Sequence, residues 1–186
     1  MARLYLALLH HPVLDKNGAV VTTAVTNMDV HDIARLARTF ELDGFYVATP
    51  VETLRRLVQR IIHHWEEGWG ATYNATRKDA LALVRLAPDL DAVITDVERE
   101  CGALPRLVAT SARDGGDRLG YDALRERLAA PGPPVLLVFG TGWGLTRELL
   151  DRMDDVLEPI RGRGDYNHLS VRSAAAIILD RLHRPR

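Results

Sequence analysis

Cysteine occurs only once in the sequence, at Cys101, so no disulfide can form within the chain. A chain without a disulfide framework is typical of a reducing compartment. Long hydrophobic runs are also missing, because no stretch approaches the ~20 apolar residues that cross a membrane. The apolar run Leu4–Leu9 is too short for a signal-peptide core, and residues 10–12 (H-H-P) follow it in place of a small-residue cleavage site. We therefore expect a cytoplasmic protein without a membrane-spanning part.

The sequence has no excess of charge of either sign, because 24 lysines and arginines face 25 aspartates and glutamates. This balance excludes a strongly basic nucleic-acid binder, so any contact with RNA must be local. Two histidine pairs, at 10–11 and 63–64, are adjacent in sequence and lack the i, i+4 spacing of zinc ligands on a helix, so we predict no metal site. A length of 186 residues, 47% of them hydrophobic, predicts one domain covering residues 1–186.

Short runs of β-branched and aliphatic residues predict strands at Leu4–Leu9, Gly44–Ala48, 107–110 and 135–139. Helical periodicity follows each run. This order predicts an α/β fold in which a parallel sheet carries helices on both faces. The expected helices are one from residue 30 capped by Asp29, one opened by Pro50, and five more at 77–87, 90–101, 121–130, 146–153 and 170–182.

The last predicted helix, 170–182, is unusual because it is apolar on nearly every side. Ser170 is placed to cap its first turn. A helix of this kind must be covered on more than one side, either by its own sheet and another segment or by a second subunit. We expect both kinds of cover, and therefore a homodimer.

A glycine-rich stretch, G-T-G-W-G-L at 140–145, follows the predicted strand 135–139. Glycines at the carboxyl end of a parallel strand let the backbone approach a ligand closely, and open α/β sheets bind cofactors there. The spacing matches neither the dinucleotide fingerprint nor the phosphate-binding P-loop, so it does not favour a nicotinamide or a nucleoside triphosphate. A tight turn without a ligand is the alternative.

Two further segments carry polar groups. Residues 160–173, I-R-G-R-G-D-Y-N-H-L-S-V-R-S, run from a glycine-bearing loop into the last helix, which places side chains and free helix N–H groups beside a pocket. The alternative is a loop that only caps the helix. Residues 26–39, T-N-M-D-V-H-D-I-A-R-L-A-R-T, place arginines on a helix face, where they could anchor a phosphate or simply face solvent.

The order and spacing of these segments resemble the three motifs of SPOUT methyltransferases, and most closely the small single-domain group of SAM-dependent RNA methyltransferases. Residues 32–39 are similar to the signature N-x-G-x-x-x-R-T, with Asp32 for asparagine, Ala34 for glycine and Arg38 at the functional arginine. Residues 137–145, L-V-F-G-T-G-W-G-L, resemble the cofactor loop, and N-H-L-S-V-R-S-A-A-A-I-I-L, from 167 onward, resembles the final motif.

The resemblance implies a C-terminal trefoil knot, an exception to the rule against threaded chains. It further implies S-adenosyl-L-methionine bound in the knot, methylation of a ribose 2'-hydroxyl or a base nitrogen of tRNA or rRNA, and a homodimer through the C-terminal knot helices with each site completed by the partner chain. The implied cofactor-binding residues are Thr110, Phe139, Gly140, Thr141, Gly142, Gly144, Ile160, Asn167, His168, Leu169, Ser170 and Ser173.

The resemblance also implies catalytic roles for Arg38 and for Asp165, whose place in the loop before the final motif is similar to that of a carboxylate in guanine-N1 methyltransferases. Asn27, Asp29 and Arg35 are the expected substrate-binding residues. The chain departs from the family pattern in two places, because Gly142 lies near the usual acidic residue and Ser170 replaces a common asparagine. A catalytically idle knotted dimer that binds SAM or RNA therefore remains the alternative.

Aromatic residues near the end of the second predicted helix offer another RNA contact. Trp65, Trp69 and Tyr73 could stack a flipped base, although tryptophans at a helix end more often pack under a loop.

Overall fold

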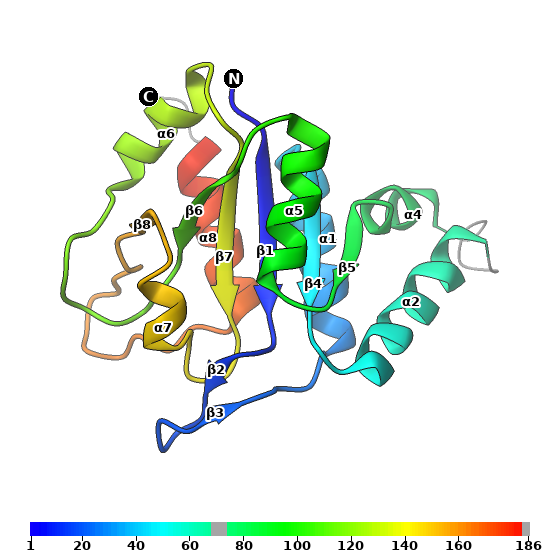
Figure 1. Cartoon of the computed structure of the whole chain (residues 1–186), viewed down its shortest axis with the longest axis horizontal. Helices are drawn as coiled ribbons and strands as arrows, with labels where there is room; N and C mark the ends of the chain where they lie inside the picture. The colour runs from blue at the N-terminus through cyan, green and yellow to red at the C-terminus, as the bar shows by residue number, and fades with distance from the viewer. Residues whose placement is uncertain (68–73, 184–186) are drawn as a thin grey trace.

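The computed structural model describes residues 1–67 and 74–183. Its main sheet has six parallel strands in the order β5-β4-β1-β7-β6-β8 (Figure 1). These strands are β1 (Leu4–Leu9), β4 (Gly44–Ala48), β5 (Val84–Ala87), β6 (Arg106–Ala109), β7 (Val135–Gly140) and β8 (Asp155–Val156). A small antiparallel pair, β2 (Val13–Leu14) and β3 (Val20–Val21), extends beyond the carboxyl end of β1. The predicted parallel α/β sheet is confirmed.

The central strand β1 lies between β4 and β7, and all of its residues are buried. Successive side chains of a strand point to opposite faces. Leu4, Leu6 and Leu8 therefore enter one core, and the intervening residues of the strand enter the other. A strand buried on both faces has no polar side to display, and this explains its uninterrupted apolar sequence.

Helices cover both faces of the sheet. On one face lie α1 (Asn27–Thr39), α4 (Ala75–Leu81), α6 (Tyr121–Ala129) and α8 (Val171–His183). The other face carries α5 (Leu90–Cys101) and α7 (Arg147–Leu150). Figure 1 shows α5 in front of the sheet, α1 and α8 behind it, and α2 (Glu52–Glu66) beyond its β5 edge. β1 begins and α8 ends at the amino ends of the strands, opposite the loops that follow the arrowheads.

Three predicted details of the elements are wrong. Residues 84–87 form strand β5 in place of the end of a helix, because they pair in parallel with β4, with Val47 opposite Leu86. The helix expected at 146–153 is only the short α7. Asp29 does not cap α1, because Thr26 is the N-cap and its Oγ1 accepts the N–H of Asp29 at 3.2 Å.

Helix α8 begins directly after Ser170, whose Oγ accepts the N–H of Ser173 at 3.3 Å, as the predicted cap requires. Its buried side chains, from Ala175 to Leu182, join the core between α1 and α6. Segments of this chain therefore cover much of the helix. Ala176 and Ile177 remain partly exposed.

Trp65 has a packing role in the structure. Its ring makes an edge contact with His31 at 5.7 Å between ring centres, and the guanidinium of Arg77 lies 4.6 Å from the ring centre. Trp69 and Tyr73, the other aromatic residues proposed to stack a base, lie outside the described residues.

Within residues 1–67 and 74–183, no helix has both the length and the apolar character needed to cross a membrane. The same part of the chain contains no group of three or more His, Cys, Asp or Glu side chains that could hold a metal ion.

Candidate functional site

A cavity of about 640 Å³ lies at the carboxyl ends of β6 and β7, where the loops after these strands meet the segment 157–170 that leads into α8. This is the edge at which open α/β sheets bind ligands, and the volume falls within the range of about 300–1,000 Å³ typical of small-molecule sites. We call this cavity the main pocket.

The loop after β7 needs glycine at two positions for different reasons. A Cβ on Gly140 would lie 2.9 Å from the backbone nitrogen of Leu145, so the tight turn leaves no room for a side chain. Gly142 has φ of +59°, and a Cβ there would also lie 2.8 Å from the carbonyl oxygen of Leu14. The loop is fixed against the β2 segment by two backbone bonds of 2.9 Å, from Trp143 N–H to Leu14 O and from Leu14 N–H to Gly144 O. The glycine loop therefore has a fixed backbone where it forms the wall of the main pocket.

A chain of polar contacts, which ends at a buried histidine, supports this loop. The hydroxyl of Thr141 donates to the carbonyl oxygen of Leu9 at 3.1 Å and lies 2.5 Å from the hydroxyl of Thr23. Thr23 in turn lies 3.1 Å from Nδ1 of His10. His10 is fully buried, and its Nε2 has no hydrogen-bond partner among the described residues. Burial lowers the pKa of His10 to about 4, although the nearby Asp29 carboxylate opposes this effect.

The neutral state of His10 makes the free energy of unfolding depend on pH. Because the folded-state pKa lies near 4 and the unfolded value near 6.5, the unfolded chain binds more protons between these pH values, and stability falls as the pH drops through this window. We expect a loss of up to about 3 kcal/mol for this residue. His31, whose pKa is also lowered by burial, adds in the same direction.

Urea unfolding from pH 7 to pH 4 tests this prediction by comparing the wild type with His10→Asn. The asparagine amide can replace Nδ1 toward Thr23 but does not titrate, so the variant should show the shallower pH dependence. Parallel curves for the two proteins would contradict the assignment.

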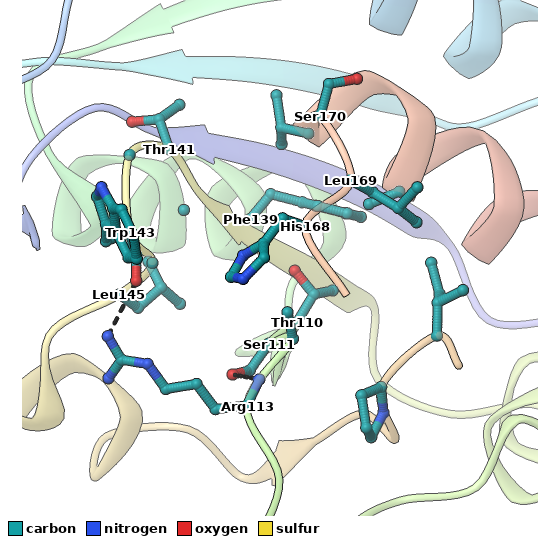
Figure 2. A pocket seen from close by; sticks show the side chains of 18 of the residues that line it. Thr110, Ser111, Arg113, Phe139, Thr141, Trp143, Leu145, His168, Leu169 and Ser170 are labelled. Carbon is teal, nitrogen blue, oxygen red and sulfur yellow. Dashed lines mark hydrogen bonds between the residues drawn. The ribbon is translucent and has the colours of Figure 1, made fainter. Parts of the chain in front are cut away.

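Side-chain bonds connect the three loops around the main pocket. Asn167 Nδ2 donates to the carbonyl oxygen of Ala112 at 2.9 Å, and Arg161 pairs with Asp114 at 2.7 Å. Arg113 donates to the carbonyl oxygen of Trp143 at 3.0 Å, the bond drawn in Figure 2. The loop after β6 is thus connected both to the glycine loop and to the segment before α8.

An ion pair joins the first turns of α1 and α8 at the pocket wall. Arg172 Nη1 lies 3.0 Å from Oδ1 of the buried Asp29, whose other oxygen accepts the hydroxyl of Thr26 at 2.6 Å. Arg172 also faces Asp32, with 3.5 Å between Nε and Oδ2. It borders both the main pocket and a second hollow of about 370 Å³, the α1–α8 groove, which is lined by Asp32, Arg35, Leu36, Thr39, Arg172, Ser173 and Ala176.

A pocket at this edge of the sheet agrees with the protein family that the sequence matches. The family model of SAM-dependent RNA methyltransferases matches residues 3–184. The chain belongs to this family. It is an enzyme that uses S-adenosylmethionine to methylate RNA.

An uncharacterized protein of Aquifex aeolicus is 47% identical to this methyltransferase over 178 residues, which cover 96% of this chain and 87% of that protein. A tRNA (guanine-N(1)-)-methyltransferase of Oleidesulfovibrio alaskensis is 46% identical over 179 residues, which cover 96% of this chain but 41% of the relative. The structure of the SpoU methyltransferase AviRb from Streptomyces viridochromogenes superposes with a TM-score of 0.62 at 19% identity, covering 97% of this chain and 58% of that one. The fold is therefore that of the SPOUT methyltransferases.

The residues of the main pocket fit the cofactor of this methyltransferase family. Apolar side chains from β7, the glycine loop and the segment before α8 can cover an adenine ring, and they include Phe139, Leu145, Leu157 and Ile160. The glycines leave no side chain between their backbone groups and the cavity, so these groups are available to a polar ligand. The main pocket therefore combines apolar side chains with exposed backbone polar groups, as small-molecule sites do.

Every predicted cofactor-binding residue except Ser173 lines the main pocket: Thr110, Phe139, Gly140, Thr141, Gly142, Gly144, Ile160, Asn167, His168, Leu169 and Ser170. Figure 2 shows several of them around the opening. Ser173 lies one turn further along α8 and lines the α1–α8 groove. Sequence reasoning missed Glu158 and Arg113, because nothing in their local sequence shows that their loops meet the glycine loop.

The structure places only two of the five predicted catalytic and substrate-binding residues of the methyltransferase at a hollow. Asp29 lines the main pocket and Arg35 lines the α1–α8 groove, whereas Arg38, Asp165 and Asn27 are exposed and line neither hollow. Counted from Asp29, the signature arginine falls on Arg35, but His31 then replaces the glycine and Leu36 the threonine, so the full signature favours Arg38. The structure distinguishes Arg35, because it lines the same groove as Arg172.

Proposed function

We propose that this methyltransferase acts on a ribose 2'-hydroxyl of tRNA or rRNA. The observation that carries the proposal is Arg172, because it borders both the main pocket and the α1–α8 groove and brings Arg35 to the same hollow. Methyl transfer to a hydroxyl requires an aligned acceptor and stabilisation of the charge that develops on its oxygen. The exposed guanidinium of Arg35, in the groove that Arg172 shares with the main pocket, can position a ribose phosphate by fork-shaped hydrogen bonding.

Bound S-adenosylmethionine supplies an electrophilic methyl group on its sulfonium. The residues of the chain then have three tasks, which are to orient the acceptor, to keep bulk water from the methyl group, and to stabilise the acceptor oxygen as its proton passes to solvent. Arg35 is exposed, and the described residues provide it with no ion pair, so its donors are available to RNA. Arg172 is held by Asp29 and Asp32 and orients the wall between cofactor and substrate.

A base nitrogen is the second candidate acceptor. Such a nitrogen loses a proton on methylation, as a ribose hydroxyl also does, and the two carboxylates that line the main pocket are already engaged. Asp29 pairs with Arg172, and Glu158 accepts the N–H of Tyr121 at 3.2 Å. Asp165 can serve a base only if its loop moves toward the pocket. The relative named as a guanine-N(1) enzyme supports this candidate, but that name describes a protein of which this chain spans 41%.

We also propose the trefoil knot and a homodimer through α1 and α8. The partly exposed Ala176 and Ile177 of α8 supply the dimer face, which borders the α1–α8 groove and leaves Arg35 open to RNA. In this arrangement Arg38, which is distant from its own main pocket, contacts RNA bound to the partner chain. Ala175 and Ile178, in contrast, are buried in the core of the monomer, so a charge at either position unfolds the chain instead of separating two chains.

Ala176→Glu should convert the dimer to a monomer while the fold is retained, because a charge is introduced into the proposed contact face and not into the core. Light scattering over a dilution series measures the change, and circular dichroism checks the fold. Ala123→Glu, on the exposed side of α6, is the matched control and should remain dimeric. A wild-type protein that is monomeric at micromolar concentration and still transfers methyl groups would exclude the shared site.

Transfer of labelled methyl from S-adenosylmethionine to total RNA, followed by nucleoside analysis, tests the proposed acceptor. We expect a 2'-O-methylated nucleoside. A base-methylated product would replace the ribose proposal with the second candidate. Binding of RNA without transfer, with cofactor bound and a broad RNA pool present, would favour the catalytically idle binder.

A further inference from the structure

Three aromatic side chains gather at the opening of the main pocket. Trp143 comes from the glycine loop, and Tyr166 and His168 come from the segment before α8. The His168 ring centre lies 6.0 Å from that of Trp143, at 60° between planes, and 5.4 Å from that of Tyr166, at 75°. Figure 2 shows Trp143 and His168 beside each other at the pocket. We call these three residues the aromatic cluster.

The aromatic cluster is exposed although it contains large rings. Trp143 is 56% exposed and Tyr166 is 79% exposed, whereas Trp65 is partly buried in packing contacts. The position of Trp143 is nevertheless fixed, because its N–H donates to Leu14 O at 2.9 Å and its carbonyl accepts from Arg113 at 3.0 Å. A large ring on a fixed backbone, open to solvent beside a pocket, has surface left for another planar ring to stack on it.

Arginines lie near the aromatic cluster in sequence or by direct contact. Arg113 is bonded to the backbone of Trp143, and Arg161 and Arg163 precede Tyr166 by a few residues. Arg161 is balanced by Asp114, but Arg163 is exposed and has no ion pair among the described residues. These loops carry as many carboxylates as arginines, with Asp165 directly before Tyr166, so the opening offers RNA guanidinium groups near exposed rings and no net positive charge. Aromatic rings next to arginines are the combination that binds unpaired nucleic-acid strands.

We propose that the aromatic cluster stacks an unpaired nucleobase of the RNA substrate, next to the nucleotide that enters the main pocket. This inference rests on the proposed function only in taking RNA as the ligand. Stacking holds a nucleotide without reading its sequence, because every base has an aromatic face. The cluster therefore selects single-stranded loops over duplexes, in which the bases are already stacked on each other.

Intrinsic tryptophan fluorescence tests the proposal, because stacking of a base quenches an indole. The full chain, saturated with S-adenosylhomocysteine, is titrated with a short single-stranded oligoribonucleotide and with the duplex of the same sequence. We expect quenching by the single strand, and its loss in Trp143→Leu together with at least tenfold weaker RNA binding. Trp143→Phe should keep most of the affinity. Leu104→Ala, an exposed apolar side chain before β6 at the other end of the sheet, is the control and should bind as the wild type.

The affinity for S-adenosylhomocysteine distinguishes a stacking surface from a cover over the cofactor. It should stay within about twofold in Tyr166→Ala, because Tyr166 is 79% exposed and does not line the main pocket. Equal losses of cofactor and RNA affinity would overturn the proposal, as would unchanged RNA affinity or equal binding of the duplex. If quenching and its loss in Trp143→Leu are observed but no methyl group is transferred, the proposed function fails and the stacking surface stands.

Discussion

Gly140→Val is expected to weaken the binding of S-adenosylhomocysteine by more than about 100-fold, equivalent to about 2.7 kcal/mol. A Cβ at this position would lie 2.9 Å from the backbone nitrogen of Leu145, so the glycine loop cannot keep its course along the main pocket. Calorimetric titration measures the affinity directly. A thermal-shift assay gives a second readout, because cofactor at a hundred times its dissociation constant stabilises the wild type by about 2.7 kcal/mol and should leave the variant unchanged.

The matched control for Gly140→Val is Gly132→Val, since an added Cβ at Gly132 meets no atom within 4 Å. The control should bind cofactor as the wild type does, which separates the loss of a loop shape from the general effect of replacing glycine by valine. Normal binding by Gly140→Val would show that the cofactor lies elsewhere.

Arg35→Ala is expected to reduce methyl transfer to RNA by about 100-fold while the affinity for S-adenosylhomocysteine remains unchanged. Arg35 lines the α1–α8 groove beside Arg172 and does not line the main pocket, so the loss should fall on the substrate alone. Arg35→Lys keeps the charge but loses the planar fork, and an intermediate rate is expected. Single-turnover transfer of labelled methyl measures these rates.

The comparison with Arg38→Ala decides which arginine of α1 acts on RNA and from which chain. A larger loss in Arg38→Ala than in Arg35→Ala would contradict the assignment to Arg35. In that case Arg38→Ala can be mixed with the cofactor-deficient Gly140→Val. Recovery of up to about a quarter of the wild-type activity would show that Arg38 serves the site of its partner. With equal amounts of the two variants, about half of the dimers are mixed, and half of the sites in each mixed dimer are then intact.

The sheet was largely predictable from the sequence, because a strand such as β1 that is buried on both faces is apolar at every position. Strand β5 was not predictable in the same way. It has four residues and contains Arg85, whose guanidinium pairs with Glu100 and donates to the hydroxyl of Tyr46 at 2.9 Å. A charged residue within so short an apolar run is also consistent with an amphipathic helix. The segment becomes a strand because it pairs with β4.

The cofactor-binding residues could be predicted because each group of them is local in sequence: a glycine loop after a strand, and a polar loop before an apolar helix. The substrate side could not be predicted as well. Arg35 and Arg38 differ by only about 60° around the axis of α1, and the spacing of the signature favours Arg38. What separates them is the pair between Asp29 and Arg172, which are 143 residues apart in sequence. No local spacing contains that information.

The main pocket lies at the carboxyl ends of the strands, whereas β1 begins and α8 ends at the opposite side of the sheet (Figure 1). Additional polypeptide joined before β1 or after α8 therefore emerges on the side away from the pocket opening. The architecture is modular in this sense, because it can be combined with other domains without obstructing cofactor or RNA. The longer relative from Oleidesulfovibrio alaskensis, of which this chain matches 41%, is compatible with such a combination.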